Sequence, residues 1–272
     1  MKQAFVIGFP IHHSKSPKLH GFWLDHYGID GSYKAVEVEP DNLTRFIENI
    51  QSNGFSGGNV TIPHKERVYE IVDQLDEAAT AIGAVNTLWF EGSKLCGGNT
   101  DAYGFGANLD AYAPDWRNGD VALVIGAGGA ARAIVFEILK SGYSTVHIVN
   151  RTYSRASALA NMFGSKCKAS EWSKLEDLLP TADFIVNTTS IGMDGGNETL
   201  LPALNKVKEQ AIVTDIVYTP LQTPFLKAAD DRQLKTVDGL GMLLHQAVPG
   251  FERWFGLRPE VTDDLRNFVL GG

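Results

Sequence analysis

The chain has 272 residues, of which 44% are hydrophobic and 21% are charged, as in an ordinary globular protein with room for two domains. Its formal net charge of −8 argues against a nucleic-acid-binding protein, which would normally carry a basic face. The two cysteines, Cys96 and Cys167, are too few for a disulfide framework and fit a reducing cytoplasm. There is no signal-peptide pattern and no apolar run long enough to span a membrane, so we expect a cytoplasmic protein without a membrane partner.

The first hundred residues alternate between strand and helix patterns. Residues 4–8 predict a strand, and Ser16 with Pro17 predicts a helix start, with serine as the cap and proline at the first helical position. Later patterns predict a strand at 33–38, a helix at 43–50, a short strand from 57 that runs into a helix started by Pro63, and a hairpin with arms at 85–90 and 94–97. Together these elements predict a small α/β domain with a mixed sheet.

The segment from 121 to 152 has the pattern of a dinucleotide site. The apolar run 121–125 predicts a strand buried on both faces, and residues 130–140 predict the helix that follows. Between them, Gly126 permits a sharp turn, Gly128 lets the backbone approach a pyrophosphate, and Ala131 allows helix and strand to pack closely. The free N–H groups and positive dipole end of the helix would bind the phosphates.

The residues after the second strand of this segment favour NADP over NAD. Chains that bind NAD usually place Asp or Glu there to accept hydrogen bonds from the ribose. This chain has Asn150, then Arg151, with Arg155 one turn further on. A guanidinium can bind a 2′-phosphate through paired, charge-assisted hydrogen bonds. The alternative is that the two arginines form a solvated helix face.

The remaining patterns predict the domain organisation. Residues 99–120 predict the crossing between domains, strand patterns recur at 184–187, 211–216 and 234–238, and helix patterns occupy 241–255 and 261–270. We predict a substrate-binding catalytic domain at 1–101, a doubly wound Rossmann NADP-binding domain at 102–240, and C-terminal helices at 241–272 that pack back on the first domain. The active site is expected in the cleft between domains, where the carboxyl ends of strands meet.

Lys65 and Asp101 are the candidate catalytic pair, because each follows a predicted strand, where loops present functional groups. Hydride transfer from an alcohol needs a group that takes the hydroxyl proton and returns it in reverse. Lysine side chains do this when burial or neighbours lower their pKa toward neutrality. A structural ion pair is the alternative, and spacing alone does not decide between them.

Eight motifs then link the chain to a known family. The first four are Ser14-Lys15-Ser16-Pro17, Asn59-Val60-Thr61-Ile62-Pro63-His64-Lys65, Gly83-Ala84-Val85-Asn86-Thr87 and Gly98-Asn99-Thr100-Asp101. The others are Gly126-Ala127-Gly128-Gly129-Ala130-Ala131, Asn150-Arg151-Thr152, Asn187-Thr188-Thr189-Ser190-Ile191-Gly192-Met193 and Asp238-Gly239-Leu240-Gly241-Met242-Leu243. In order and spacing they resemble the shikimate dehydrogenase family over about residues 7 to 246.

The resemblance implies a role for each matching residue. Lys65 would be the catalytic lysine and Asp101 its partner, both also contacting substrate. The substrate carboxylate would be held by Ser14, Ser16 and Tyr218, and the ring hydroxyls by Asn59, Thr61, Asn86 and Gln246. The phosphate turn would be Gly126, Ala127, Gly128, Gly129 and Ala130, and the adenosine pocket Asn150, Arg151, Thr152 and Arg155. Ile216 and Gly239 would contact the cofactor through their backbones, and Glu77 is a weaker cofactor match.

Structural alternatives stay open for several of these residues. Ser16 could be used as a helix cap, Asn59 and Asn86 as turn residues, and Gln246 as a partner for a core carbonyl. Met193 and Met242 are more often core residues than site residues. The histidines are not spaced as metal ligands, so no metal is assigned.

The expected activity is NADP-dependent, reversible reduction of 3-dehydroshikimate to shikimate, a step of aromatic amino acid biosynthesis, by a monomer or homodimer. One alternative is a quinate/shikimate dehydrogenase with relaxed substrate and cofactor choice, for which the room around Ser14 and Tyr218 would be decisive. A non-catalytic NADP sensor is the alternative from another class. It would have little need for Lys65 and Asp101 together.

Overall fold

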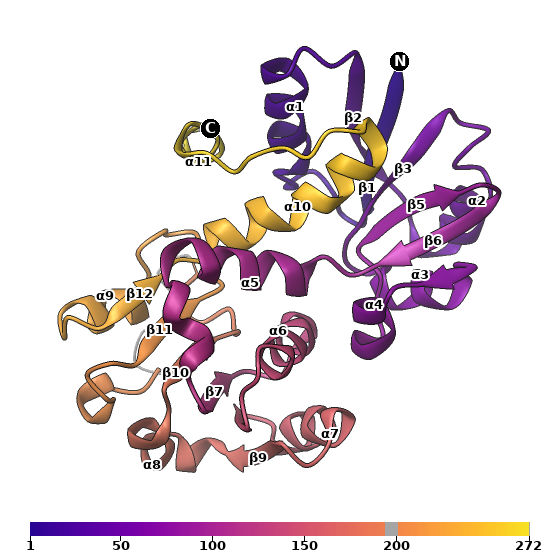
Figure 1. The fold of residues 1–272 in the computed structure, drawn as a ribbon. Coiled ribbons are helices and arrows are strands. Elements are labelled where there is room, and N and C mark those ends of the chain that lie inside the picture. The colour runs from indigo at the N-terminus through magenta and orange to yellow at the C-terminus, as the bar shows by residue number, and fades with distance from the viewer. Residues whose placement is uncertain (194–200, 272) are drawn as a thin grey trace. The chain divides into compact units, whose positions relative to one another are not determined.

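The computed structural model describes residues 1–193 and 201–271 and divides into two compact units. The first unit comprises Met1–Tyr103 with Leu244–Gly272, and the second comprises Gly104–Leu243. The chain leaves the first unit within α5 (Asp101–Tyr112) and returns to it within α10 (Leu240–Phe255) (Figure 1). None of the described helices is long and apolar enough to cross a lipid bilayer.

The first unit contains a mixed six-stranded sheet in the order β2-β1-β3-β5-β6-β4. Its strands are β1 (Lys2–Gly8), β2 (Gly31–Glu37), β3 (Phe55–Val60), β4 (Gln74–Leu75), β5 (Thr87–Glu91) and β6 (Lys94–Gly98). β1 pairs in parallel with β2 and β3, whereas β5 runs antiparallel to both β3 and β6. The predicted mixed sheet and hairpin are both confirmed. Gly92 has a φ of +64° in the turn, which is why glycine suits it.

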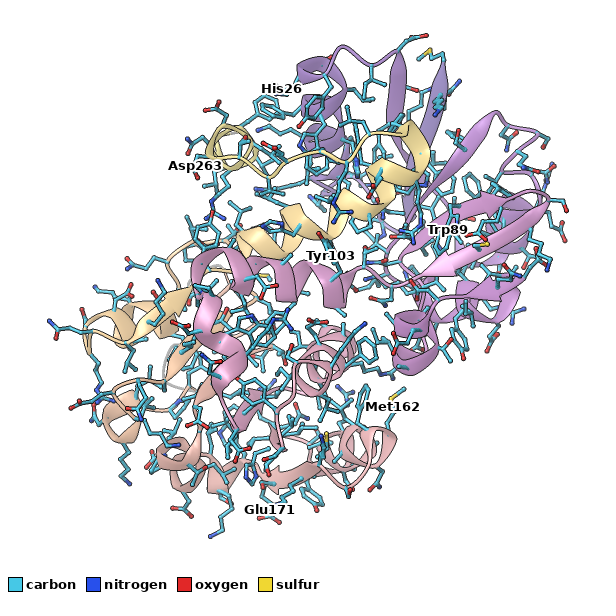
Figure 2. All side chains as sticks on the ribbon, viewed as in Figure 1. His26, Trp89, Tyr103, Met162, Glu171 and Asp263 are labelled. Carbon is cyan, nitrogen blue, oxygen red and sulfur yellow. The ribbon has the colours of Figure 1, made fainter. Side chains whose placement is uncertain are left out.

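Helices from both ends of the sequence pack in this unit. They are α1 (Ser16–His26), α2 (Leu43–Glu48), α3 (Lys65–Ile71), α4 (Glu77–Ile82), α11 (Asp263–Leu270) and the later part of α10. The indole of Trp254 in α10 donates a hydrogen bond to the Leu88 carbonyl at 2.8 Å, and Arg253 lies 4.1 Å over the ring of Trp89, which Figure 2 labels. α11 packs beside α1 (Figure 1). The C-terminal segment is therefore an integral part of the first unit.

The second unit contains six parallel strands in the order β12-β11-β10-β7-β8-β9. They are β7 (Val121–Ile125), β8 (Thr145–Asn150), β9 (Cys167–Glu171), β10 (Phe184–Asn187), β11 (Ile212–Asp215) and β12 (Lys235–Val237). The intervening helices include α6 (Gly129–Lys140), α7 (Tyr153–Phe163), α8 (Leu175–Leu178) and α9 (Pro224–Asp230). The strand order reverses between β7 and β10, as in the predicted Rossmann fold.

The apolar run of β7 is buried on both faces, as its sequence predicts. Val124 belongs to one core cluster with Ala131 and Ile134 of α6, whereas Leu123 belongs to another with Phe225 of α9. Successive side chains of a strand point to opposite faces, so one strand contributes to two hydrophobic layers.

Candidate functional site

A polar cluster lies where several strands of the first sheet begin or end, with Lys65 and Asp101 at its centre. Lys65 begins α3 shortly after β3 ends, and Asp101 begins α5 shortly after β6 ends. Lys65 Nζ donates a hydrogen bond to Asp101 Oδ2 at 2.6 Å, and the two side chains are 27% and 13% exposed. The pair is therefore shielded from water more than a typical surface ion pair.

Asn86 connects this ion pair to the protein interior. Its Nδ2 donates to Asp101 Oδ1 at 2.7 Å, while its Oδ1 accepts hydrogen bonds from the Thr100 backbone N–H at 2.9 Å and the Thr87 hydroxyl at 2.8 Å. The Asn86 side chain thus does more than close a turn. Both carboxylate oxygens of Asp101 have partners. The hydrogen bond from Asn86 holds the carboxylate, and the carboxylate in turn holds the Lys65 ammonium.

The pairing of three strands brings these residues together. Val60 N donates to the Asn86 carbonyl at 2.8 Å, and Asn86 N donates to the Gly98 carbonyl at 2.9 Å. Because β5 is antiparallel to β3 and β6, its first residues meet the last residues of both neighbours. Segments that are distant in sequence therefore form one site.

Asn59 extends the network along β3. Its Oδ1 accepts a hydrogen bond from the Tyr33 hydroxyl at 2.6 Å, and its Nδ2 donates to the Asn86 carbonyl at 3.1 Å and to Thr87 Oγ1 at 3.2 Å. Asn59 is thus connected to the same cluster as Asn86. Thr61 is half-buried nearby, and its hydroxyl has no hydrogen-bond partner in the part of the chain that the structure describes.

Ser14 and Ser16 lie at the start of α1, but not as the sequence predicts. The cap position is Lys15, which makes no side-chain capping bond, and Ser14 Oγ accepts a hydrogen bond from Ser16 N at 3.3 Å. The expected capping role of Ser16 is wrong, because the turn before the helix is closed by the Ser14 side chain. The Ser16 hydroxyl is therefore not used as a cap.

Two further candidate substrate residues lie on elements elsewhere in the chain. Gln246 is half-buried on α10, and its amide has no hydrogen-bond partner among residues 1–193 and 201–271, so the alternative of a bonded core amide is not supported. Tyr218 follows β11 in the second unit, where burial raises the pKa of its hydroxyl.

The glycine-rich turn of the second unit has the geometry of an anion site. Gly126 has a φ of +116°, and a Cβ there would lie 2.4 Å from Thr188 Oγ1. Gly128 and Gly129 are exposed, and a Cβ on either would meet no atom within 4 Å. The N-terminus of the twelve-residue helix α6 therefore has open space in front of its free N–H groups, which suits a pyrophosphate.

The residues after β8 also fit a phosphorylated ribose. Asn150 Nδ2 donates to the Thr152 carbonyl at 3.0 Å, which fixes the turn. Arg151 and Arg155 are exposed, and neither guanidinium forms a hydrogen bond or ion pair with a described residue. Both are therefore available for an anion.

The other candidate cofactor residues lie apart from this turn. A Cβ at Gly239 would lie 2.4 Å from the Ile216 carbonyl oxygen, so the two backbones touch and a side chain at 239 is excluded. Glu77 is exposed at the first position of α4, in the first unit.

Sequence reasoning missed a buried carboxylate at the end of β11. Asp215 is fully buried and accepts hydrogen bonds from Asn187 Nδ2 at 2.9 Å, Val217 N at 3.0 Å and the Thr223 hydroxyl at 2.8 Å. Burial raises the pKa of Asp215 to about 6, although these three donors oppose the shift. Its place at the end of a buried strand was the available signal.

The described residues offer no group of three or more His, Cys, Asp or Glu side chains that could hold a metal ion. His64 is buried, and its Nε2 donates to the Val38 carbonyl at 2.7 Å, which is a structural role.

Comparisons with known proteins agree along the whole chain. Three family models match: "Shikimate dehydrogenase substrate binding domain" over residues 6–88, "Shikimate / quinate 5-dehydrogenase" over 113–242 and "Shikimate 5'-dehydrogenase C-terminal domain" over 239–263. The shikimate dehydrogenase (NADP(+)) of Brucella abortus (strain S19) is 59% identical over 271 residues, which cover 99% of this chain and 94% of that protein.

Two solved structures are similar over nearly their whole length. The shikimate 5-dehydrogenase of Thermus thermophilus, in complex with NADP(H) and shikimate, is 36% identical with a TM-score of 0.86, covering 99% of this chain and 98% of that chain. The quinate dehydrogenase of Corynebacterium glutamicum, in complex with NAD, is 30% identical with a TM-score of 0.90, covering 100% of this chain and 99% of that chain.

Proposed function

The chain belongs to the shikimate dehydrogenase family, and on that premise we propose that Lys65 and Asp101 are its catalytic pair. The protein is an NADP-dependent oxidoreductase that acts on an alcohol group, and its reaction is the reversible reduction of 3-dehydroshikimate to shikimate. The observation that carries the residue assignment is the shielded ion pair between Lys65 Nζ and Asp101 Oδ2, in which Asn86 donates a hydrogen bond to the other oxygen of Asp101.

Lys65 would handle the proton of the reacting oxygen. NADPH, when bound, supplies the hydride. As negative charge develops on the ketone oxygen, the Lys65 ammonium donates a proton to it, and the neutral amine takes that proton back in the reverse direction. Asp101 keeps the ammonium in place, and Asn86 keeps Asp101 from rotating. This division of roles needs only groups that already contact one another.

The remaining residues would bind the substrate and cofactor. Ser14, Ser16 and Tyr218 are neutral donors suited to one carboxylate, whereas Asn59, Thr61, Asn86 and Gln246 are suited to ring hydroxyls. Thr61 and Gln246 support this because their polar side chains lack partners within the described residues. The α6 N-terminus would hold the pyrophosphate, Arg151 and Arg155 the 2′-phosphate, and Ile216, Gly239 and Glu77 would complete the cofactor site.

Replacing Lys65 tests the catalytic assignment. Lys65→Ala should lower kcat by about 10²–10⁴-fold while shikimate affinity changes little, because one positioned acid/base group is lost. Lys34→Ala is the matched control, since Lys34 is an exposed lysine of the same unit whose ammonium donates to Gln3 and to no other described residue. A near-normal kcat, or a loss confined to KM, would show that Lys65 is not the acid/base group.

Quinate is the competing substrate, because a quinate dehydrogenase shares the fold and the fold alone does not separate the two activities. Quinate carries an extra hydroxyl beside its carboxylate, which Tyr218 would crowd. We expect kcat/KM to favour shikimate with NADP. Nicotinamide absorbance measured with each substrate and each cofactor checks this, and turnover by itself excludes a non-catalytic sensor.

We further expect a cytoplasmic enzyme that is a monomer or homodimer. Cys96 and Cys167 are buried and unpaired, so the described fold needs no oxidising compartment. Light scattering on the purified protein measures the assembly directly.

A further inference from the structure

We propose that Tyr33 is a positioning residue of the substrate pocket: it holds the Asn59 amide so that Asn59 can only accept a hydrogen bond from the substrate. The inference rests on the proposed role of Asn59 in binding a ring hydroxyl. It adds a residue outside the proposed site and states which chemical group Asn59 selects.

The orientation of the Asn59 amide follows from its neighbours. The Asn86 carbonyl oxygen, 3.1 Å from Asn59 Nδ2, can only accept a hydrogen bond, so the NH₂ end must face it. The second N–H is directed at Thr87 Oγ1 at 3.2 Å, and Thr87 in turn donates its hydroxyl hydrogen to Asn86 Oδ1. Both N–H groups of Asn59 therefore have partners within the protein.

The direction of the Tyr33 hydrogen bond follows in turn. With its NH₂ end fixed, Asn59 presents Oδ1 to Tyr33 Oη at 2.6 Å. A carbonyl oxygen does not donate, so the phenol must be the donor. One lone pair of Oδ1 is then occupied and one is left. The remaining capacity of Asn59 is a single acceptor site.

An aromatic cluster holds the Tyr33 ring in place. The ring stacks on His20, with ring centroids 4.0 Å apart and planes 18° apart. The Trp254 ring belongs to the same cluster, with its centroid 5.9 Å from that of Tyr33. His20 is fully buried, and neither ring nitrogen has a hydrogen-bond partner among the described residues. Burial lowers the pKa of His20 to about 3, with Asn59 acting in the opposite direction, so the stacked imidazole is neutral.

The consequence concerns specificity. A substrate hydroxyl can donate to the free lone pair of Asn59, whereas a ketone, ether or fluorine at the same ring position cannot. Asn86 and Thr87 set the direction of the Asn59 amide, and Tyr33 holds its oxygen by occupying one of the two acceptor sites, so this part of the pocket is selective for a hydroxyl. Tyr33 also lies beside Ser16, whose side chain opposes the burial effect that raises the pKa of the phenol. Tyr33 is thus next to Asn59, which is proposed to bind a ring hydroxyl, and next to Ser16, which is proposed to bind the substrate carboxylate.

A double-mutant cycle tests the inference. Tyr33→Phe keeps the ring stacked on His20 but removes the donor, and KM for shikimate should rise about three- to tenfold, while kcat and the KM for NADP stay within about twofold. In an Asn59→Ala background the same substitution should have no further effect on KM. An equal rise in both backgrounds, or lost stability with unchanged KM, would overturn the proposal.

The control is Tyr143→Phe, which removes another buried phenol that donates to a backbone carbonyl, that of Trp116 in the second unit. It should lower stability without changing KM for shikimate.

Substrate analogues provide a second test on wild-type protein. Each ring hydroxyl is replaced in turn by hydrogen or by fluorine, and at the position that Asn59 contacts both replacements should weaken binding equally. Near-normal binding of that fluoro analogue would mean that Asn59 donates, and would overturn the proposal. If instead Asn59→Ala itself leaves KM unchanged, the proposed substrate role of Asn59 fails. That outcome is distinct from a failure of Tyr33 to act through Asn59.

Discussion

Arg151 is exposed after β8, and its guanidinium forms no hydrogen bond or ion pair with a described residue. Its binding to a 2′-phosphate would therefore break no internal ion pair. Asn150 beside it carries no charge that would repel the phosphate. At this corner of the second unit, cofactor preference is a property of individual side chains rather than of the fold.

Replacing Arg151 should weaken selection of NADP. A hydrogen bond to a charged group contributes about 1.5–3 kcal/mol, so Arg151→Ala should raise KM for NADP about tenfold to a hundredfold. KM for NAD and kcat should change little, and Arg155→Ala should show a smaller loss of the same kind. Added salt should weaken NADP binding more in the wild type than in Arg151→Ala. Parallel losses for both cofactors would show that Arg151 only supports the fold.

Ser14 should select a charged carboxylate on the substrate. Its oxygen accepts from Ser16 N, so its hydroxyl hydrogen is free to donate outward. Replacing the substrate carboxylate by a neutral amide leaves donors unpaired, at about 1–3 kcal/mol each. The amide should lower kcat/KM clearly in wild type and less in Ser14→Ala, whereas the exposed control Ser52→Ala should behave as wild type. Equal losses in Ser14→Ala and wild type would place the carboxylate elsewhere.

At the scale of elements, close packing of β3 against β1 positions Asn59. A Cβ on Gly58 would lie 2.4 Å from Phe5 Cδ2 and 2.5 Å from the Phe5 carbonyl oxygen, and the carbonyl is backbone that cannot rotate away. Gly21 in α1 is the opposite case, because a Cβ there would meet nothing within 4 Å.

Alanine at these two glycines should therefore act in opposite directions. Gly58→Ala should lower the free energy of unfolding by about 1–3 kcal/mol through overpacking. Gly21→Ala should raise it by about 0.5–1 kcal/mol, since alanine favours a helix over glycine. Urea denaturation of both variants measures the two effects. Stabilisation by Gly58→Ala would mean that β3 moves away from β1 at little cost.

At the scale of the whole molecule, two aspartates make stability depend on pH with opposite signs. Burial raises the pKa of Asp215 from 3.8 to about 6. Burial also acts to raise the pKa of Asp183, but its bonds to Lys208 and to the backbone N–H groups of Val121 and Asp120 outweigh it, and the pKa is lowered. Folding thus favours the protonated form of Asp215 and the ionised form of Asp183.

Asp215→Asn should reveal this contribution. The stabilisation from protonating Asp215 is fully present below pH 3.8 and is lost as pH rises through about 6. The free energy of unfolding of wild type minus that of Asp215→Asn should therefore fall by about 3 kcal/mol from low to neutral pH, at about 1.4 kcal/mol per pKa unit. Urea denaturation at several pH values checks it.

Asp183→Asn should show the reverse trend, because the contribution of Asp183 is present above pH 3.8 and is lost as pH falls further. A pH-independent difference for Asp215→Asn would mean that the pKa of Asp215 is the same in the folded and unfolded states.

The sequence by itself determined the local features. Period-two and period-3.6 patterns located the buried strands and long helices, and glycine spacing identified the turn before α6, because these depend on residues close together in the chain. Family motifs identified the activity and NADP. The edge strand β9 was not predicted, because its residues Cys-Lys-Ala-Ser-Glu are mostly polar and only Cys167 among them is buried.

Only the tertiary structure decided which polar groups meet and in which direction they bond. The antiparallel insertion of β5 between β3 and β6 brings Asn59, Asn86 and Asp101 together, although 42 positions separate the first from the last (101 − 59). Strand pairing over such separations depends on the packing of whole elements, which local spacing does not encode. The same holds for Tyr33 and Asp215, whose roles follow from the lone pairs and N–H groups left over once the sheets have formed.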